Sequence, residues 1–329
     1  MPLPERQLIS RLKRASQTSA ARFAHRPLIA GIGEDCSIVR IPSGHEALVT
    51  TDFSLESVHF RREWHPAKSV GHRCLARGLS DIAAMGGEPA AAFLSLAIPP
   101  KVPQKWVDDF IGGFLALAKK SGVVLAGGDT ASSPEGILAD VIMIGSVPTG
   151  KAILRSGARP GDLVYVTGAL GGAAATLGLL YSGAAKLHAR SFPAHFFPVP
   201  RIKVARVLRQ KNIASSMIDI SDGLSTDLSH MCDESGVGAE IHEQKIPRAK
   251  IGSPRRTVEP RFALNGGDDY ELLFAARPRT SVPCNIVGVP VTQIGRITRQ
   301  KQMRLVLGDG SVTELKPRGW EHFGRASTR

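Results

Sequence analysis

The sequence predicts an α/β protein with mixed sheets, built from two domains. Segments with the apolar pattern of strands alternate with segments of helical spacing along the whole chain. The 329 residues suffice for two domains of ordinary size, each with its own core. Glycine and proline punctuate residues 148–162, near the middle of the chain. We therefore expect one domain over residues 1–150 and a second over residues 151–329.

The first domain is expected to begin with a short amphipathic helix, because residues 1–14 alternate charged and apolar side chains. Ala47–Thr51 has the pattern of a short strand that runs into Asp52. Helical spacing over Lys68–Met85 ends at two glycines, which is typical of a helix C-terminus. The remaining elements are a strand, a helix opened by proline and two strands, at Ala90–Ile98, Pro103–Lys120, Val123–Ala126 and Leu138–Val147.

The second domain is expected to start again with a strand, Leu163–Thr167, followed by a glycine-rich turn and an alanine-rich helix. Leu305–Leu315 has the pattern of a hairpin, because Asp309-Gly310 is a favoured pair for a tight turn. Further strands are expected at Ser216–Ile220, Glu240–Ile246 and Glu271–Ala275.

The formal charge of 42 − 29 = +13 raises the question of nucleic acid. The basic residues are scattered, however, and aromatic residues make up only 5% of the chain. No aromatic residues interleave with the small basic clusters, as a platform for single strands would require. Anionic small substrates explain the charge equally well, and we expect no nucleic-acid partner.

No apolar run approaches the roughly 18 residues of a membrane span, and the N-terminal segment lacks the apolar core of a signal peptide. Four cysteines lie far apart and form no CxxC pair, which disfavours a disulfide framework and a zinc site. We therefore expect reduced thiols, a cytoplasmic location and no membrane partner.

Acidic residues gather in turns rich in glycine or small residues, at the ends of expected strands and helices. The segments are Gly33-Glu34-Asp35, Thr50-Thr51-Asp52, Ser80-Asp81, Gly127-Gly128-Asp129-Thr130, Asp219-Ile220-Ser221-Asp222-Gly223 and Gly267-Asp268-Asp269. One such aspartate is usually a helix cap or a turn former. Six such segments in a chain rich in cations indicate a site for hard cations, because Mg²⁺ prefers carboxylate and hydroxyl oxygens.

The usual phosphate-binding signatures are absent from the sequence. It contains no P-loop, no protein-kinase motif set and no HExxH zinc motif. Gly168-Ala-Leu-Gly171-Gly172 follows a strand and opens a helix, so it fits either a phosphate site at a helix N-terminus or tight packing between strand and helix. Aspartate ligands that leave metal positions open for phosphate oxygens would suit metal-assisted phosphoryl transfer.

Eight motifs occur in order over residues 29–323: Gly31–Cys36, Thr50–Phe60, Leu79–Gly86, Gly127–Thr130, Arg155–Asp162, Ile218–Leu224, Gly266–Leu272 and Gly319–Phe323. Together they resemble the thiamine-monophosphate kinase family of the aminoimidazole ribonucleotide synthetase-like superfamily. The resemblance implies ATP-dependent phosphorylation of thiamine monophosphate to thiamine diphosphate, by direct in-line transfer of the γ-phosphoryl group assisted by several Mg²⁺ ions. It also implies a homodimer formed through the sheet of the N-terminal domain, which binds ATP and Mg²⁺. The C-terminal domain then completes the nucleotide and substrate site.

The resemblance also implies roles for individual residues. Metal positions are matched by Asp35, Thr50, Thr51, Asp52, Asp81, Asp129, Asp219 and Asp222. ATP positions are matched by Gly128, Asp129, Arg155 and Ser221, and thiamine phosphate positions by His59, Asp268 and Trp320. Among these we expect Asp52, Asp129 and Arg155 to act in catalysis. Asp268 stands where the family usually has glutamate, and Glu34 where it commonly has aspartate.

Other functions remain open on the sequence alone. A cyclo-ligase of the same superfamily is excluded by no single residue. A selenophosphate-type enzyme would need a reactive cysteine and a lysine in a glycine-rich N-terminal stretch, and a hydrogenase maturation factor would end in cysteine rather than Ala326-Ser-Thr-Arg329. A non-catalytic basic nucleic-acid-binding protein would leave the acidic segments unexplained.

Overall fold

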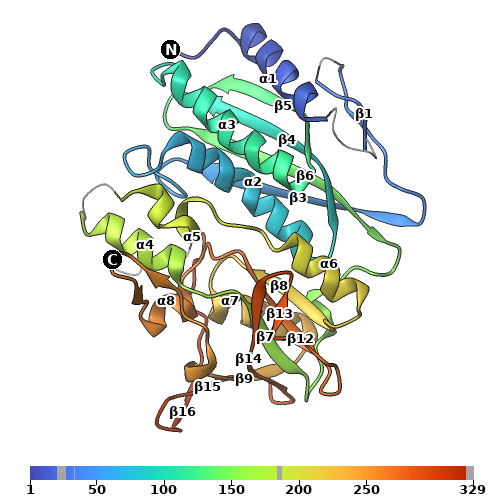
Figure 1. The fold of residues 1–329 in the computed structure, drawn as a ribbon, viewed down its shortest axis with the longest axis vertical. Coiled ribbons are helices and arrows are strands. Elements are labelled where there is room, and N and C mark those ends of the chain that lie inside the picture. Colours follow the sequence, from blue (N-terminus) through green and yellow to red (C-terminus); the bar gives the residue numbers. More distant parts are fainter. Residues whose placement is uncertain (21–26, 33, 184–186, 324–329) are drawn as a thin grey trace. The chain divides into compact units, whose positions relative to one another are not determined.

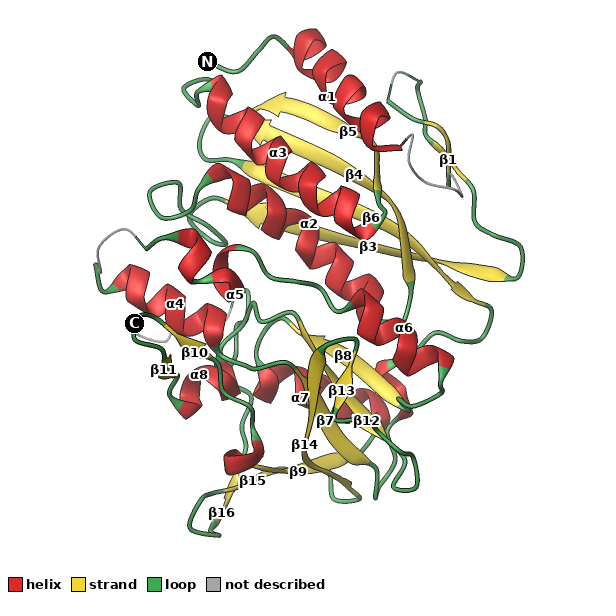
Figure 2. Ribbon diagram, viewed as in Figure 1, coloured by secondary structure: helices red, strands yellow, loops and turns green. Residues whose placement is uncertain are grey.

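The computed structural model of the chain describes residues 1–20, 27–32, 34–183 and 187–323. It divides into two compact units, Met1–Ala152 and Ile153–Arg329. Each unit combines helices with β-sheet (Figures 1 and 2), which confirms the predicted α/β class. Residues 326–329 and Gly33, both considered above, lie outside the described residues.

The first unit is built on a four-stranded sheet with the order β3-β6-β4-β5. The strands are β3 (His45–Leu55), β6 (Leu138–Pro148), β4 (Glu88–Ile98) and β5 (Val124–Ser132). β6 pairs antiparallel with both of its neighbours, whereas β4 and β5 are parallel. Helices α2 (Ala67–Ala84) and α3 (Gln104–Ser121) lie over one face of this sheet (Figure 2).

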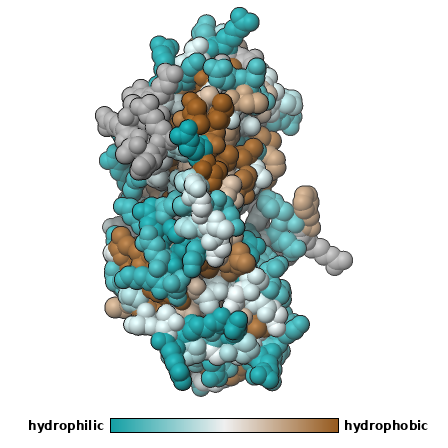
Figure 3. All heavy atoms as spheres, turned by 90° about the vertical axis from the view of Figure 1, so that its right-hand side faces the viewer, coloured by the Kyte–Doolittle hydropathy of each residue, from teal (hydrophilic) through white to brown (hydrophobic). Residues whose placement is uncertain are grey.

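Side chains of β3 alternate between the two faces of the sheet, as the pleat requires. Leu48 and Ser54 point toward the helices, whereas Val49 and Phe53 point away and are 66% and 56% exposed. Ile142 lies on the same exposed face and is paired across the ladder with Thr51. Hydrophobic side chains also gather on the side of the first unit that Figure 3 shows. The sheet therefore has one covered face and one face that keeps apolar side chains in solvent.

Helices α2 and α3 cross at glycines that allow their backbones to touch. A Cβ atom on Gly71 of α2 would lie 1.9 Å from the carbonyl oxygen of Phe110, and one on Gly113 of α3 would lie 2.0 Å from that of Lys68. The chain leaves α3 through Gly122, whose φ of 74° is the left-handed conformation that favours glycine.

The N-terminal helix α1 spans Glu5–Ala20 and is longer than residues 1–14. It packs against β5, where the hydroxyl of Ser16 donates to the carbonyl of Leu125 over 2.6 Å. Two short strands, β1 (Leu28–Ala30) and β2 (Ile38–Val39), form a separate antiparallel pair.

The second unit is built on an eight-stranded sheet with the order β16-β15-β9-β14-β7-β12-β8, and β13 pairs with β14. Every pair is antiparallel except β15 with β9. The strands are β7 (Leu163–Thr167), β8 (Ser216–Ile220), β9 (Gly238–His242), β12 (Glu271–Ala276), β13 (Asn285–Ile286), β14 (Val289–Thr298), β15 (Met303–Val306) and β16 (Val312–Glu314).

Helix α7 (Leu224–Ser235) packs against β8 and β9 and contributes Leu224, Leu228 and Met231 to the buried core of this unit. The other helices are α4 (Gly172–Tyr181), α5 (Pro193–Phe196), α6 (Ile202–Gln210) and α8 (Pro260–Asn265), with short 3₁₀ turns at Arg155–Gly157, Ala189–Ser191 and Glu243–Lys245. A small pair, β10 (Lys250–Ile251) and β11 (Arg256–Thr257), completes the unit.

The predicted and observed elements differ mainly at strand ends. β9 ends at His242 instead of continuing to Ile246, because Glu243–Lys245 forms a 3₁₀ turn. β5 extends to Ser132 instead of ending at Ala126, because its pairing with β4 continues to the Ile98–Ser132 pair. The long strand β14, which the sequence reading did not anticipate, joins β7 to β9 in the centre of the sheet.

We predict that Gly71→Ala lowers the free energy of unfolding by at least about 2 kcal/mol, because the new methyl group would meet the Phe110 backbone. Gly112→Ala is the matched control: this glycine lies in α3 with open space around its Cβ position, so alanine should stabilise the helix by about 0.4–1 kcal/mol. Urea unfolding of both variants measures the difference. Equal effects would contradict the close crossing of α2 and α3.

Candidate active site

Five of the residues expected to bind metal in the first unit lie inside its strands and helices. Thr50, Thr51 and Asp52 belong to β3, Asp81 to α2 and Asp129 to β5. The expected strand Ala47–Thr51 and helix Lys68–Met85 already contained Thr50, Thr51 and Asp81. The expectation that Asp52 and Asp129 follow strand ends is wrong, because the β3–β6 ladder continues to the Leu55–Leu138 pair and the β4–β5 ladder continues to the Ile98–Ser132 pair.

The structure brings Thr50 and Asp81 together and turns Thr51 to the other face. The Thr50 hydroxyl donates to Oδ2 of Asp81, which joins β3 to α2. Asp52 lies two residues from Thr50 and so shares its helix-covered face. Thr51 points to the uncovered face, where its hydroxyl donates to Oδ1 of Asp140 over 2.8 Å. The three consecutive residues therefore offer oxygen atoms on both sides of the sheet.

Gly128 and Asp129 lie in β5, and the segment that carries Asp35 is tied to the same strand. The hydroxyl of Ser37, two residues after Asp35, donates to the carbonyl of Ala126 over 2.8 Å and ties this segment to the strand. Gly128 has a φ of 146°, and a Cβ there would lie 1.9 Å from the carbonyl oxygen of Leu94, so only glycine fits. Asp35 and Asp129 are both exposed, and Oδ1 of Asp129 accepts the N–H of Thr130 over 2.8 Å.

His59 lies in the loop that follows β3. The ring Nδ1 of His59 accepts the backbone N–H of Leu55 over 3.0 Å, and the backbone N–H of His59 donates to the Leu55 carbonyl. Because Nδ1 is an acceptor, the neutral ring carries its proton on Nε2. The loop thus fixes the ring orientation and makes Nε2–H the second polar group of the side chain.

In the second unit, Asp219 lies near the end of β8 and Asp222 in the turn that leads to α7. Oδ2 of Asp227, a buried residue in the first turn of α7, accepts the N–H groups of Ser221, Asp222 and Gly223 over 3.1, 3.1 and 3.0 Å. Burial, and then repulsion from the carboxylates of Asp219 and Asp222, raises the pKa of Asp227 well above its ordinary value. One carboxylate oxygen therefore holds the whole turn.

The Asp268 loop is hydrogen-bonded to that same turn. The N–H of Asp268 donates to the carbonyl of Ser221 over 2.8 Å, and the N–H of Tyr270 donates to that of Ile220 over 2.9 Å. Asp268 and Tyr270 have φ values of 67° and 51°, which non-glycine residues rarely adopt. The Tyr270 hydroxyl donates to Oδ1 of Asp268 over 2.6 Å, so the side chain of Asp268 has a defined orientation.

Asp269 explains the glycine-rich turn before α4. Its Oδ2 accepts the N–H of Gly171 over 2.6 Å, and burial raises its pKa to about 8. A Cβ on Gly168 would lie 2.0 Å from Oε1 of Glu271, and one on Gly171 would lie 2.6 Å from the N of Ala263. Since the chain's own carboxylate occupies this helix start and the glycines permit close contacts, the packing interpretation accounts for the turn.

Glu271, the last acidic residue of this motif, is a structural residue of β12. It is 4% exposed, pairs with Arg201, and accepts the hydroxyl of Thr167 over 2.6 Å. The N–H of Leu272 in turn donates to the Thr167 hydroxyl over 2.8 Å. The network fixes the start of β12 against β7, immediately after the Asp268 loop.

Arg155 starts a 3₁₀ turn and is anchored by its backbone. Its carbonyl accepts the hydroxyls of Ser216 and Ser235 over 2.7 and 2.8 Å, while the residue itself is exposed. A Cβ on Gly157 would lie 1.8 Å from the Ser215 carbonyl oxygen, so the turn packs directly on the chain before β8. The fixed backbone and exposed guanidinium suit contact with an anionic ligand.

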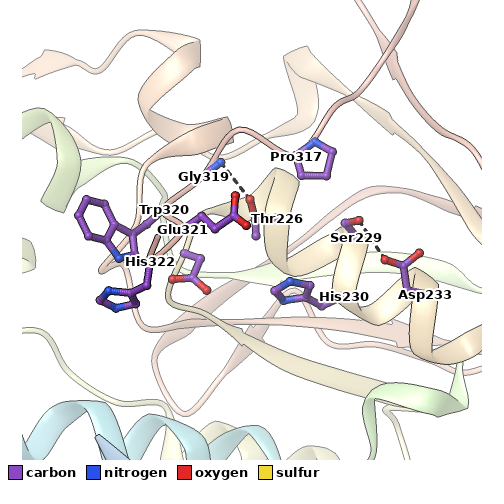
Figure 4. Close-up of a pocket in the computed structure, with 10 residues that line it drawn as sticks. Thr226, Ser229, His230, Asp233, Pro317, Gly319, Trp320, Glu321 and His322 are labelled. Atoms are coloured by element: carbon purple, nitrogen blue, oxygen red, sulfur yellow. Dashed lines mark hydrogen bonds between the residues drawn. The ribbon is translucent and has the colours of Figure 1, made fainter. Parts of the chain in front are cut away.

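Trp320 is also anchored by its backbone and keeps its ring partly in solvent. Its N–H donates to the Asp222 carbonyl over 2.9 Å, and the N–H of Gly319 donates to the Thr226 hydroxyl over 2.9 Å. Trp320 is 41% exposed and lies at the rim of a pocket of about 380 Å³ between α7 and the C-terminal segment (Figure 4). The α7 side of this pocket presents Thr226, Ser229, His230 and Asp233.

The donor chemistry of the acidic segments fits a hard cation. The atoms offered are carboxylate and hydroxyl oxygens, which is the set that Mg²⁺ prefers. Among the described residues, no group of three or more His, Cys, Asp or Glu side chains is close enough to hold a metal ion by itself. A cation bound to one of these segments would therefore need further oxygen ligands beyond the protein carboxylates.

Comparison with known proteins identifies the family. The AIR synthase related protein N-terminal and C-terminal domain models match residues 33–147 and 159–308. A thiamine-monophosphate kinase of Escherichia coli K12 is 37% identical over 305 residues, which cover 89% of this chain and 91% of that protein. The chain belongs to the thiamine-monophosphate kinase family. It is therefore a kinase with the AIR synthase-like fold, as the motifs led us to expect.

Solved structures of this family share the fold of the chain. The thiamine-monophosphate kinase of Stenotrophomonas maltophilia K279a is 31% identical, with a TM-score of 0.80 over 95% of this chain and 99% of that chain. The structure of AaThiL complexed with AMPPCP and TMP is 29% identical, with a TM-score of 0.76 over 98% of this chain and 99% of that chain.

Several residues that organise the site were not anticipated from the sequence. Asp227 holds the Ser221–Gly223 turn, Tyr270 orients Asp268, and Thr226 holds the Trp320 segment. The one signal for Asp227 was its place in the first turn of a helix, where a carboxylate is favoured by the helix dipole. That signal does not reveal that the carboxylate reaches back to three N–H groups before the helix.

We predict that stability falls as pH rises toward 8 because of Asp269. Its pKa of about 8 in the folded protein lies above its ordinary value of 3.8, so the folded state binds the proton more tightly than the unfolded state. Its contribution is fully present below about pH 4 and is lost as pH rises to 8, by at most about 1.4 kcal/mol per pH unit. Asp269→Asn should abolish this part of the pH dependence between pH 5 and 8.

Urea unfolding at several pH values measures the slope. Glu234→Gln, which removes an exposed carboxylate from α7, is the control and should keep the slope of the original chain. An unchanged slope in Asp269→Asn would contradict the assignment.

Proposed function

We propose that this chain transfers the γ-phosphoryl group of ATP to thiamine monophosphate, with several Mg²⁺ ions, and so forms thiamine diphosphate in the last step of its biosynthesis. The observation that carries the proposal is the kinship with thiamine-monophosphate kinases over nine-tenths of the chain. The related AaThiL, crystallised with AMPPCP and TMP, supports the same pair of substrates.

The acceptor explains why the chain needs no catalytic base. The phosphate of thiamine monophosphate is already ionised at neutral pH, so no proton has to be removed before attack. The barrier is the repulsion between two polyanions, and Mg²⁺, when bound, supplies the positive charge that offsets it. We propose that Asp35, Thr50, Thr51, Asp52, Asp81 and Asp129 hold these ions in the first unit, and Asp219 and Asp222 in the second.

The remaining site residues bind and orient the substrates in this proposal. Gly128, Asp129, Arg155 and Ser221 contact ATP, and the exposed guanidinium of Arg155 stabilises phosphate charge. The Trp320 ring stacks on the cationic thiazolium. Asp268, oriented by the Tyr270 hydroxyl, and His59, oriented by the N–H of Leu55, contact the thiamine phosphate.

We predict that Asp52→Asn lowers kcat for thiamine diphosphate formation at least about a hundredfold, as loss of a charge-organising group does. Asp109→Asn is the control, because this residue lies in α3 and pairs with Lys105 at the surface. A coupled assay with ATP and thiamine monophosphate, with and without Mg²⁺, measures both variants. Unchanged activity in Asp52→Asn would argue against the metal site, and no thiamine diphosphate from the original chain would contradict the function.

A homodimer through the sheet of the first unit belongs to the same proposal. Its support is the uncovered sheet face, which leaves Val49, Phe53 and Ile142 in solvent. Monomeric proteins rarely keep a contiguous apolar face exposed. The proposal also includes a cytoplasmic setting, small-molecule substrates and neither nucleic acid nor membrane as partner. The four free cysteines support only the reducing compartment. None of the described helices is long and apolar enough to span a membrane.

We predict that Phe53→Glu converts a dimer to a monomer, because the charge would be buried at the sheet interface. Val312→Glu, at an exposed valine of β16 in the second unit, is the control and should leave the dimer intact. Light scattering after size-exclusion chromatography measures the mass of each. A dimer that survives Phe53→Glu would place the interface elsewhere.

A further inference from the structure

The hydrogen bonds of Asp227 to the turn before α7 run in the opposite direction to those of an ordinary helix cap. A cap residue normally lies before its helix and accepts N–H groups from the first helical turn. Here the carboxylate lies in the first turn and reaches back to the N–H groups of Ser221, Asp222 and Gly223. All three bonds end on one atom, Oδ2, so the position of this atom fixes three successive peptide groups.

The arrangement exists despite an electrostatic cost. Asp227 is 1% exposed, and the carboxylates of Asp219 and Asp222 repel it. An ordinary cap of serine, threonine or asparagine at the residue before the helix would not place a third acidic side chain beside Asp219 and Asp222. The turn also requires Gly223 at a φ of 123°, where a Cβ would lie 2.8 Å from the carbonyl carbon of Asn265. These contacts thus fix a single backbone conformation of the turn, in addition to stabilising the start of the helix.

The opposite side of the same turn holds the substrate-side residues. The carbonyl of Ser221 accepts the N–H of Asp268, and the carbonyl of Asp222 accepts the N–H of Trp320. The N–H groups of the turn are therefore fixed by Asp227, while its carbonyl groups fix the backbone of Asp268 and Trp320. A shift of the turn would displace Asp222, Asp268 and Trp320 together.

We propose that Asp227 is a positioning residue that aims Asp222 at the metal-bound phosphates and, through the same turn, fixes Asp268 and Trp320 relative to it. The inference rests on the proposed function for the roles of these three residues. It adds a residue that touches neither substrate nor metal and acts only through backbone N–H groups.

Asp227→Asn and Asp227→Ala test this inference. Asparagine keeps the size and one oxygen acceptor, whereas alanine removes every acceptor. We expect the half-saturating Mg²⁺ concentration, measured by calorimetry with AMPPCP present, to rise roughly tenfold or more in Asp227→Ala and less in Asp227→Asn. The KM for thiamine monophosphate should rise in the same order. Hydrogen exchange should show lost protection in the peptide that contains residues 221–223.

Glu234→Gln is the matched control, since it removes an exposed carboxylate from the same helix and should change none of these quantities. If Asp227 serves only stability, the variants will unfold at lower temperature while the Mg²⁺ titration and the KM stay unchanged, which overturns the proposal. Equal losses in the two Asp227 variants, with protection of residues 221–223 intact, would point to charge rather than position and also overturn it.

The calorimetric and exchange measurements separate this inference from the proposed function. They need no turnover, so they read the effect of Asp227 even if the original chain forms no thiamine diphosphate. If Asp227→Ala does not fold, Asp227→Asn still gives the Mg²⁺ titration, and an unchanged half-saturating concentration there counts against the proposal.

Discussion

The three bonds from backbone N–H groups to Oδ2 of Asp227 are the interaction on which the second unit's site depends. They fix a turn that carries Asp222 and, through its carbonyl groups, the backbones of Asp268 and Trp320. Buried carboxylates are tolerated when hydrogen bonds replace the lost water. Through these hydrogen bonds, one buried side chain also fixes the positions of several segments that are far apart in the sequence.

The first unit organises its oxygen atoms differently, through the regular pleat of a sheet. The alternation of β3 sends Thr50 toward Asp81 under the helices and Thr51 toward Asp140 on the uncovered face. Gly128 adds a backbone position that no other residue could take. In this unit a strand and a glycine therefore position the oxygen atoms, whereas in the second unit a hydrogen-bonded turn positions them.

The sequence predicted the class of the fold, most strands and helices, and the family, because these depend on local periodicity and on ordered motifs. It did not predict that Asp52 and Asp129 lie within strands, since strand length depends on pairing with β6 and β4, which are distant in sequence. Nor did it predict the contacts of Asp227 or Tyr270. A side chain that reaches back along the chain, or a positive φ at Tyr270, leaves no periodic signal.

The proposed reaction is a direct transfer between two bound phosphates, with protein residues that organise charge and none that becomes phosphorylated. The stereochemistry at phosphorus tests it most directly, with ATP made chiral at the γ-phosphorus by oxygen isotopes and thiamine monophosphate as acceptor. A single in-line displacement predicts inversion of configuration in the thiamine diphosphate formed. Retention would require two displacements through a phosphorylated residue of the enzyme and would contradict the account.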